Sequence, residues 1–276
     1  MTRIRVSASV LLATALHALA TTAAGETPTP PEHPLVPVLN MAGDSYRRIE
    51  REITDYTCNL TKRERINGRL SDTESMFVKV RHERIENERV VAPFSVYARF
   101  LGPERVKGRE VLYVQGANHG KLIVRNGGVK FGYITTAVLP DSPVAMQEGR
   151  YPLTEIGVKN LTRRLIENGQ TELKSGQCAV KTLPGAKIND RPCTLILVSS
   201  SLRQGALPYQ YAHIFVDDQM QIPVRYAAYD WPEKAGGPSR LLEEYTYTDV
   251  RLNVGLTDWD FDHRNEEYQF LKSFKP

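Results

Sequence analysis

The sequence has few of the residues that mark a disulfide-bonded or nucleic-acid-binding protein. It contains 3 cysteines in 276 residues, and aromatic residues make up 8%. Lys and Arg number 36 against 32 Asp and Glu, so the formal net charge is only +4 and the charge is mixed. A disulfide framework and a nucleic-acid surface, which needs clustered basic residues, are therefore not predicted. The length and the 41% hydrophobic content predict a folded chain of one or two domains.

The longest uncharged stretch lies at the start of the sequence. Arg3 and Arg5 precede an apolar run over residues 6–20, and small residues follow up to Ala24. This order predicts an export signal over residues 1–24. An uncleaved membrane anchor is the alternative, although polar residues interrupt the run. The sequence therefore predicts a periplasmic or secreted protein of the bacterial cell envelope, without a transmembrane segment after signal removal.

In an exported protein the three cysteines can form one disulfide bond. Cys178 and Cys193 flank two predicted turns that could bring neighbouring strands together, so they are the first candidate pair. A bond between Cys58 and Cys193, and no bond at all, remain open. No cysteine lies in a CxxC pair or at a zinc-ligand spacing from a histidine, so neither a redox site nor a metal site is predicted.

Prolines separate the leader from the rest of the chain. Five of them lie within residues 25–38, a density that predicts a stiff extended linker. No later boundary divides the sequence, so residues 39–276 are predicted to form one domain. Within it, apolar residues from Ala42 to Ile53 follow a helical period. A second helix is predicted from near Thr154 to a glycine stop at Asn168-Gly169.

Most of the remaining chain alternates as strands do. Tyr56, Cys58 and Leu60 alternate with polar residues, and Asn67-Gly68 offers the positive φ that a two-residue hairpin turn needs. Such runs, joined by turns, predict an antiparallel meander on each side of the second helix. The expected strands are 56–61, 76–80, 94–101, 109–115, 121–125, 129–134, 193–199, 211–216, 223–229, 241–250 and 257–261.

Two of these strands, Phe94–Leu101 and Tyr211–Val216, are apolar on both faces. A one-sided antiparallel sheet should alternate instead. Because two short helices cannot cover both faces of some ten strands, we predict a strongly curved sheet with a concavity. The concavity is either open for a ligand or filled by the protein's own side chains, and the sequence leaves both open. The predicted fold class is α+β, an unclosed antiparallel barrel with an N-terminal helix and one inserted helix.

Several short runs are shared with a known family. They include Met76–Glu83, Pro93–Tyr97, Gly108–Tyr113, Leu242–Tyr247 and Leu252–Asp258. Through these runs the chain resembles, over residues 40–270, a secreted, planctomycete-type domain family of unknown function. The sequence departs from the family pattern at residues 84–92, an insertion expected to lengthen a hairpin tip.

By the order of its elements, that family is in turn similar to the LolA/LolB lipoprotein-carrier superfamily. The resemblance implies a LolA-like half-barrel with a hydrophobic cavity in a periplasmic protein. It does not imply lipoprotein transport, because one fold hosts several functions. Aromatic residues of the strands are the candidates for lining such a cavity, although packing in the core is the favoured interpretation. The candidates are Phe77, Tyr97, Phe100, Tyr113, Phe215 and Trp231.

Catalytic and metal-binding patterns are weak. Asp258, Asp260 and Asp262 alternate, but the calcium-loop pattern is incomplete after them. His213 could form a catalytic triad with serines and aspartates elsewhere in the sequence, but the Gly-x-Ser-x-Gly nucleophile elbow is missing. No catalytic residue, metal ligand or cofactor is therefore predicted. The charged hairpin over residues 62–83 is interpreted as a solvated face, with contact to anionic lipid headgroups or a partner as the alternative.

The leading hypothesis is a non-enzymatic envelope protein that binds a lipid, an acyl chain or a lipoprotein in an apolar concavity. Each acyl methylene removed from water contributes about 0.8 kcal/mol, and ten provide roughly 8 kcal/mol, enough for micromolar binding. The second hypothesis is an envelope protein-interaction module or sensor without cargo, using the tip at 84–92. The third is an uncharacterised hydrolase.

Overall fold

The computed structural model describes residues 32–128, 132–175, 178–200, 209–234 and 236–276. The elements described below belong to one unit, His33–Pro276. The predicted export signal and residues 25–31 of the predicted linker lie outside the described residues.

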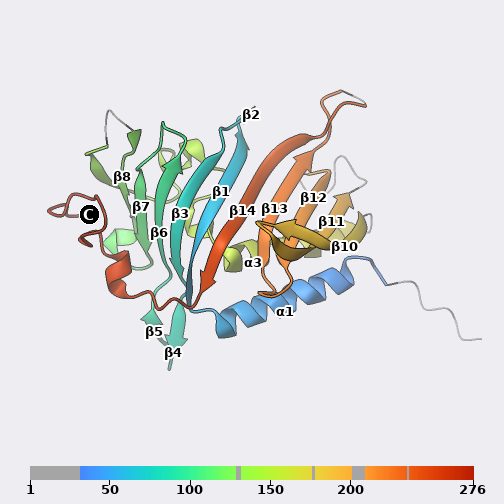
Figure 1. Ribbon diagram of the computed structural model, residues 1–276, viewed down its shortest axis with the longest axis horizontal. Coiled ribbons are helices and arrows are strands. Elements are labelled where there is room, and N and C mark those ends of the chain that lie inside the picture. Colours follow the sequence, from blue (N-terminus) through green and yellow to red (C-terminus); the bar gives the residue numbers. More distant parts are fainter. Residues whose placement is uncertain (1–31, 129–131, 176–177, 201–208, 235) are drawn as a thin grey trace, which may run out of the picture. The chain divides into compact units, whose positions relative to one another are not determined.

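One large antiparallel sheet forms most of this unit (Figure 1). Within the described ranges, its 12 strands follow the order β10-β11-β12-β13-β14-β1-β3-β6-β7-β8-β9, with β2 paired to β1. The end strands β10 and β9 are not paired with each other, so the sheet is not closed into a barrel. This confirms the predicted α+β class with an unclosed antiparallel sheet. The strands are β1 (Asp55–Ile66), β2 (Arg69–Leu70), β3 (Glu74–Arg81), β6 (Ser95–Gly102), β7 (Glu110–Val114), β8 (Leu122–Arg125), β9 (Thr135–Val138), β10 (Cys178–Ile188), β11 (Arg191–Ser200), β12 (Tyr211–Asp217), β13 (Pro223–Asp230) and β14 (Arg240–Leu252).

Tight turns agree with their sequence signals. Asn67 and Gly68 have φ angles of 49° and 79° and join β1 to β2, as the Asn-Gly pair predicts. Asn189 and Asp190 have φ angles of 48° and 62° and join β10 to β11. Both turns therefore use the left-handed backbone region that asparagine, aspartate and glycine tolerate best.

The insertion at residues 84–92 forms a hairpin of its own between β3 and β6. It consists of β4 (Arg84–Glu86) and β5 (Arg89–Ala92), which pair only with each other. The side chains of Ile85 and Val90 face each other across it and are 57% and 54% exposed. The insertion therefore presents apolar residues to solvent below β3 in Figure 1.

Helix α1 (Val36–Glu52) begins earlier than predicted. The predicted linker extended to residue 38, but Pro37 lies in the first turn of the helix. Proline is compatible with that position, because first-turn N–H groups have no helical acceptor and the fixed φ of proline is helical. The end of the linker that is predicted from the proline density therefore lies beyond the true start of the helix, at Val36. Ile49 of this helix is fully buried.

Helix α3 (Val158–Ser175) continues past the predicted stop at Asn168-Gly169. The glycine serves a close approach of α1 instead, because a Cβ atom on Gly169 would lie 2.7 Å from Leu39 Cδ2. At the other end of α3, the Tyr56 hydroxyl accepts a 3.0 Å hydrogen bond from the Val158 N–H. No helix in the described part of the chain is long and apolar enough to span a membrane.

The two faces of the sheet have different covers. Helix α3 contacts β10 and β13, and we call this side the inner face and the opposite side the outer face. Residues 257–261 do not form the predicted strand, because Asp258–Phe261 form a 3₁₀ turn, η4, against β6 and β7. The chain after β14, residues 253–276, is here called the C-terminal segment (red in Figure 1). Its rings form an outer-face cluster with the strands, comprising Tyr97, Leu112, Ile123, Phe261, Tyr268 and Phe270, with Phe77 packed against it.

All three cysteines are free thiols, so the predicted Cys178–Cys193 disulfide bond is wrong. In the β10–β11 hairpin, Cys178 lies opposite Ser200 and Cys193 lies opposite Ala186. The two cysteines are thus near opposite ends of the hairpin, roughly 20 Å apart at ~3.3 Å per residue. Burial raises the pKa of Cys58 to about 12, which keeps this thiol protonated.

Two strands differ from the sequence pattern. The predicted strand 129–134 lies partly outside the described residues, and β9 pairs with β8 just after it, at Thr135–Val138. Strand β10 is absent from the predicted strands, because Pro184-Gly185 is one of the two turns predicted between Cys178 and Cys193. The structure places Pro184 and Gly185 at a register shift between Leu183 and Ala186, within a continuous strand.

Candidate functional site

The inner face of β1, β3 and β6–β9 presents an apolar floor. Leu60 lies opposite Met76, and Met76 lies opposite Phe100 on the next strand. Alternate residues of the neighbouring strands continue this row on the same face. The floor consists of Leu60, Met76, Phe100, Val111, Leu122, Val124 and Val138.

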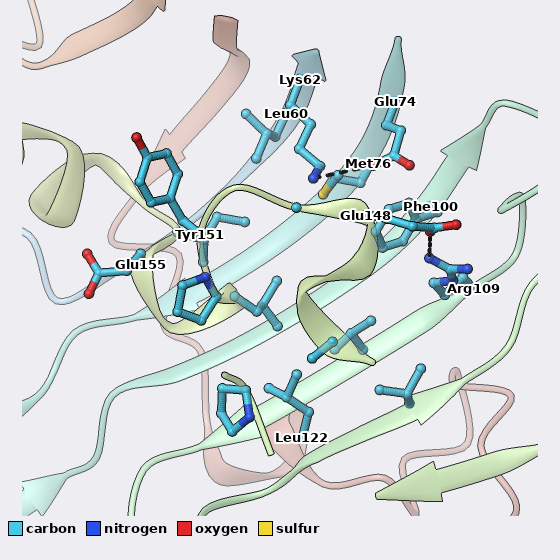
Figure 2. A pocket seen from close by; sticks show the side chains of 18 of the residues that line it. Leu60, Lys62, Glu74, Met76, Phe100, Arg109, Leu122, Glu148, Tyr151 and Glu155 are labelled. Atoms are coloured by element: carbon cyan, nitrogen blue, oxygen red, sulfur yellow. Dashed lines mark hydrogen bonds and ion pairs between the residues drawn. The ribbon is translucent and has the colours of Figure 1, made fainter. Parts of the chain in front are cut away.

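The connection between β9 and α3, residues 139–157, passes over this floor, and we call it the strap. Two 3₁₀ turns, η2 (Ala145–Glu148) and η3 (Leu153–Glu155), lie within it. Figure 2 shows the strap crossing above the strands that carry Met76 and Phe100. Between strap and floor lies a cavity of about 370 Å³, which we call the inner cavity. Its volume is within the range of small-molecule sites.

Charged residues continue the inner face beyond the apolar floor. Glu64 and Glu74 are almost fully buried, and Lys62 Nζ lies 3.0 Å from Glu64 Oε2 and 3.4 Å from Glu74 Oε2. Burial acts to lower the pKa of Lys62, but the two carboxylates outweigh it and raise that pKa above its ordinary value. Lys62 is therefore charged. The interpretation of residues 62–83 as a solvated face is wrong for these three side chains.

Two ion-pair anchors tie the strap to the sheet. Glu148 Oε2 accepts a 2.7 Å hydrogen bond from Arg109 Nη1, and Glu148 also pairs with Arg105. Burial acts to raise the pKa of Glu148, but the two arginines outweigh burial and lower that pKa. Further along the strap, Arg150 Nε lies 2.8 Å from Glu243 Oε2 on β14. Charge therefore fixes the strap to the sheet at Glu148 and Arg150, two positions apart.

The second anchor contains a carboxylate with a shifted pKa. Glu243 is 4% exposed, and the Tyr151 hydroxyl donates a 3.3 Å hydrogen bond to it. Burial raises the pKa of Glu243 although Arg150 and Arg164 act to lower it. Arg164 comes from α3 and stacks on the Tyr151 ring, with Cζ 3.4 Å from the ring centre. A cation thus lines the inner cavity beside Tyr151.

Of the six predicted cavity residues, Phe100 lines the inner cavity. Tyr113 lines a separate cavity of about 360 Å³ beside His82. Phe77 and Tyr97 belong to the outer-face cluster under the C-terminal segment. Tyr97 and Phe100 are three positions apart in one strand and therefore point to opposite faces.

Phe215 and Trp231 are not among the residues that line the inner cavity. Phe215 alternates with the inner-facing Ile214 and lies under the guanidinium of Arg225, 5.5 Å from its Cζ. Trp231 follows β13 and is half-buried. One of the six predicted residues therefore lines the inner cavity, and the structure places the other five on different parts of the fold.

A second apolar cavity, of about 410 Å³, lies among α1, α3 and β11–β13. Leu39 of α1 and Ile196 of β11 contribute apolar walls, and the fully buried Glu172 of α3 also lines it. Helix α3 stands between the two cavities. Its Leu161 lines the inner cavity, while Leu165 lines the second one.

The catalytic and metal patterns of the sequence do not assemble in the described residues. Each aspartate of the alternating set binds a basic side chain: Asp258 binds Arg81, Asp260 binds Lys79 and Asp262 binds Arg264. His213 stacks on Tyr211 and Asp217 binds Arg191, so no triad forms. Within the described ranges, no group of three or more His, Cys, Asp or Glu residues is placed to hold a metal ion.

Sequence reasoning missed the charged lining of the inner cavity. Lys62 and Glu64 continue the alternation of Leu60 and therefore share its face, a signal that was available. Glu148 and Arg164 lie in a predicted loop and a predicted helix. Nothing in their local pattern marks them, because the strap brings them to the cavity through tertiary contacts.

No curated protein matches the sequence. Among solved structures, a DUF1329 family protein from Desulfovibrio piger is 12% identical, covers 83% of this chain and 98% of its own, and has a TM-score of 0.38. The lipoprotein LppX of Mycobacterium tuberculosis is 14% identical, with coverages of 82% and 100% and a TM-score of 0.40. A LolA superfamily protein from Nitrosomonas europaea is 12% identical, with coverages of 81% and 97% and a TM-score of 0.32.

A sequence family matches most of the chain. Residues 53–270 match the family described as protein of unknown function (DUF1571). The matched span includes every strand of the sheet, the strap and most of the C-terminal segment. This match confirms the resemblance to a domain family of unknown function that the shared sequence runs indicate. The chain belongs to the DUF1571 family.

Proposed function

We propose that the protein is a non-enzymatic protein of the bacterial cell envelope that binds a lipid, an acyl chain or a lipoprotein's acyl group in the inner cavity. The observation that carries this proposal is the apolar floor that stands apart from the strap and leaves about 370 Å³. Protein interiors are otherwise close-packed, and an apolar concave surface left uncovered over this volume marks a binding site. A hydrophobic ligand supplies the missing contacts. The envelope location is supported by the export signal expected at residues 1–24.

The energy available to such a ligand is sufficient without covalent chemistry. Each methylene buried on the floor contributes about 0.8 kcal/mol, so an acyl chain with roughly ten buried methylenes gains about 8 kcal/mol. This corresponds to micromolar affinity when little ordering opposes it. The two anchors hold the strap in place before binding, which keeps the ordering cost small.

Native mass spectrometry of the protein purified from its own envelope tests the proposal, and we expect a bound lipid. A fluorescent fatty acid is expected to bind the emptied protein. Ala145→Trp, which places an indole ring from the strap into the cavity, should abolish uptake. Ala179→Trp on β10 is the matched control, because Ala179 is exposed and away from the cavity. No uptake by the wild type, or equal uptake by wild type and Ala145→Trp, contradicts the proposal.

A second candidate function, an envelope interaction module, is favoured by the hairpin β4–β5. More than half of each of its two facing side chains, Ile85 and Val90, is exposed. Replacing both by serine should abolish capture of a specific envelope protein while thermal stability stays nearly constant. Unchanged capture by the double variant excludes the hairpin as the interaction site.

A further inference from the structure

The charges that line the inner cavity are almost completely balanced by one another. Among the described residues, seven charged side chains line it, and six of these have an ionic partner. Lys62 is held by two glutamates, Arg109 pairs with Glu148, and Glu155 pairs with Arg163 Nη2 at 2.6 Å. The seventh is Arg164.

Arg164 makes no hydrogen bond or ion pair with the described residues. The nearby carboxylate of Glu243 is already occupied by Arg150 at 2.8 Å and by the Tyr151 hydroxyl at 3.3 Å. The guanidinium of Arg164 instead lies over the Tyr151 ring, with Cζ 3.4 Å from the ring centre. Stacking fixes the plane of the guanidinium and leaves its N–H donors free.

A half-buried guanidinium that has no hydrogen-bond partner among the described residues favours an anion in its neighbourhood. Partly desolvated cations are unfavourable without a partner, and a carboxylate or phosphate matches the fork of a guanidinium. The floor next to Arg164 is apolar, from Leu60 to Val138. One cavity of about 370 Å³ therefore combines a cation held over a tyrosine ring with a hydrophobic surface.

We infer that the ligand of the inner cavity is a single-chain amphiphile with an anionic headgroup, whose carboxylate or phosphate binds Arg164 and whose acyl chain lies on the floor. This inference rests on the proposed function and specifies its ligand class. A cationic headgroup is disfavoured, because it would meet Arg164 and every lining carboxylate already has a cation. A neutral headgroup would leave the Arg164 guanidinium without a charged hydrogen-bond partner.

Four ligands of equal chain length and inorganic phosphate test this inference by isothermal titration below micelle-forming concentrations. Dodecanoate and dodecyl phosphate should bind the wild type at least about tenfold more tightly than dodecanol or dodecyltrimethylammonium, because a charge-assisted hydrogen bond contributes about 1.5–3 kcal/mol. Inorganic phosphate should not bind. Arg164→Gln should remove the preference for anionic heads and leave the affinity for dodecanol unchanged.

Arg47→Gln is the matched control, because Arg47 is an exposed arginine of α1 that pairs with Asp44, and neither residue lines the inner cavity. It should keep the preference. If dodecanol binds the wild type as tightly as dodecanoate, or if Arg164→Gln keeps the preference, the headgroup assignment is overturned while cavity binding stands. If inorganic phosphate binds as tightly as dodecyl phosphate, the site binds a free anion and the acyl assignment fails. If none of the amphiphiles binds the wild type, the proposed function itself fails.

Discussion

Strands β3, β6, β7 and β8 carry apolar side chains on both faces, and the chain covers the two faces differently. On the outer face, the C-terminal segment brings aromatic rings into direct contact, and the rings of Tyr97 and Tyr268 stack with centroids 3.9 Å apart. On the inner face, the strap leaves about 370 Å³ above the floor. The strands are the same in both cases. The cover of a sheet face, rather than its apolar composition, therefore decides whether a cavity forms.

The attachments of the two covers explain this difference. The C-terminal segment is held along its length by rings and by charged contacts, such as Lys79 Nζ to Asp260 Oδ1 at 2.8 Å. The strap is held by the ion pairs of Glu148 and Arg150, two positions apart, and by apolar contacts of Ala145, Leu153 and Ile156. Its one aromatic ring, Tyr151, lies against Arg164 rather than on the floor, whereas the rings of the C-terminal segment pack directly on the strands.

The largest expected effect is on the outer face. Tyr268→Ala should lower the free energy of unfolding by about 4 kcal/mol, because this side chain is 4% exposed and stacked on Tyr97. Trp259→Ala is the control from the same segment. Trp259 is 52% exposed, so its loss should cost less than about 1 kcal/mol. Urea unfolding measures both, and equal effects would show that the segment is not packed as described.

Acid should weaken the inner face before the outer face. Burial, with a smaller effect of Lys159, lowers the pKa of His82 to about 4, although the backbone oxygen of Ile53, 2.8 Å away, opposes this. The unfolded chain has a His pKa of about 6.5, so it binds the proton first as pH falls. This stability is complete above pH ~6.5 and is lost progressively toward pH ~4, in total about 3 kcal/mol.

The variant His82→Gln isolates this contribution. Between pH 7 and pH 4 the wild type should lose about 3 kcal/mol more than the variant in urea unfolding. Parallel losses in the two proteins would mean that His82 is not buried in a neutral form at the end of β3.

A smaller effect is expected for the one predicted aromatic residue on the floor. Phe100→Ala should cost about 2 kcal/mol, roughly half the effect of Tyr268→Ala, because part of its ring faces the cavity and has fewer contacts to lose. A cost equal to that of Tyr268→Ala would indicate that the inner face is as tightly packed as the outer one, and would remove the basis of the comparison.

The smallest effect concerns the ion pair that holds the outer cover. Burial acts to raise the pKa of Asp260, but the Lys79 ammonium and the Thr257 N–H outweigh burial and lower that pKa. The stability it contributes is present above the unfolded pKa of about 3.9 and is lost as pH falls through the lower folded value. Asp260→Asn should therefore cost about 1 kcal/mol at pH 7, and the difference from the wild type should narrow below pH ~4. A difference that stays constant with pH would exclude an ionised pair.

Local patterns predicted the sheet well. The Asn67-Gly68 turn and the alternation of β1, β3 and β6 follow from nearest neighbours in the chain, and the structure has both. The apolar pattern on both faces of Phe94–Leu101 correctly indicated two dry surfaces. It could not indicate which cover is tight, because the C-terminal segment that packs on Tyr97 lies more than 150 positions away in the sequence.

The errors have the same origin. Pro37 and Gly169 were interpreted by their usual local roles, but a helix start accepts the first and the close approach of Leu39 requires the second. Candidate cavity residues were chosen by ring type rather than by face, so Tyr97 and Phe100 were grouped although they diverge. The sequence does not single out Arg164, because its importance arises from the absence of an ionic partner among the residues that the structure describes.

The two ion pairs that hold the strap differ in their exposure to solvent. The Glu148 side chain is 40% exposed and that of Glu243 is 6% exposed, so dissolved salt screens the first anchor much more than the second. Rising ionic strength should therefore weaken the Glu148 anchor first, while Arg150 still holds the strap to β14. The affinity of a guest for the floor and the salt sensitivity of its cover are thus set by different residues.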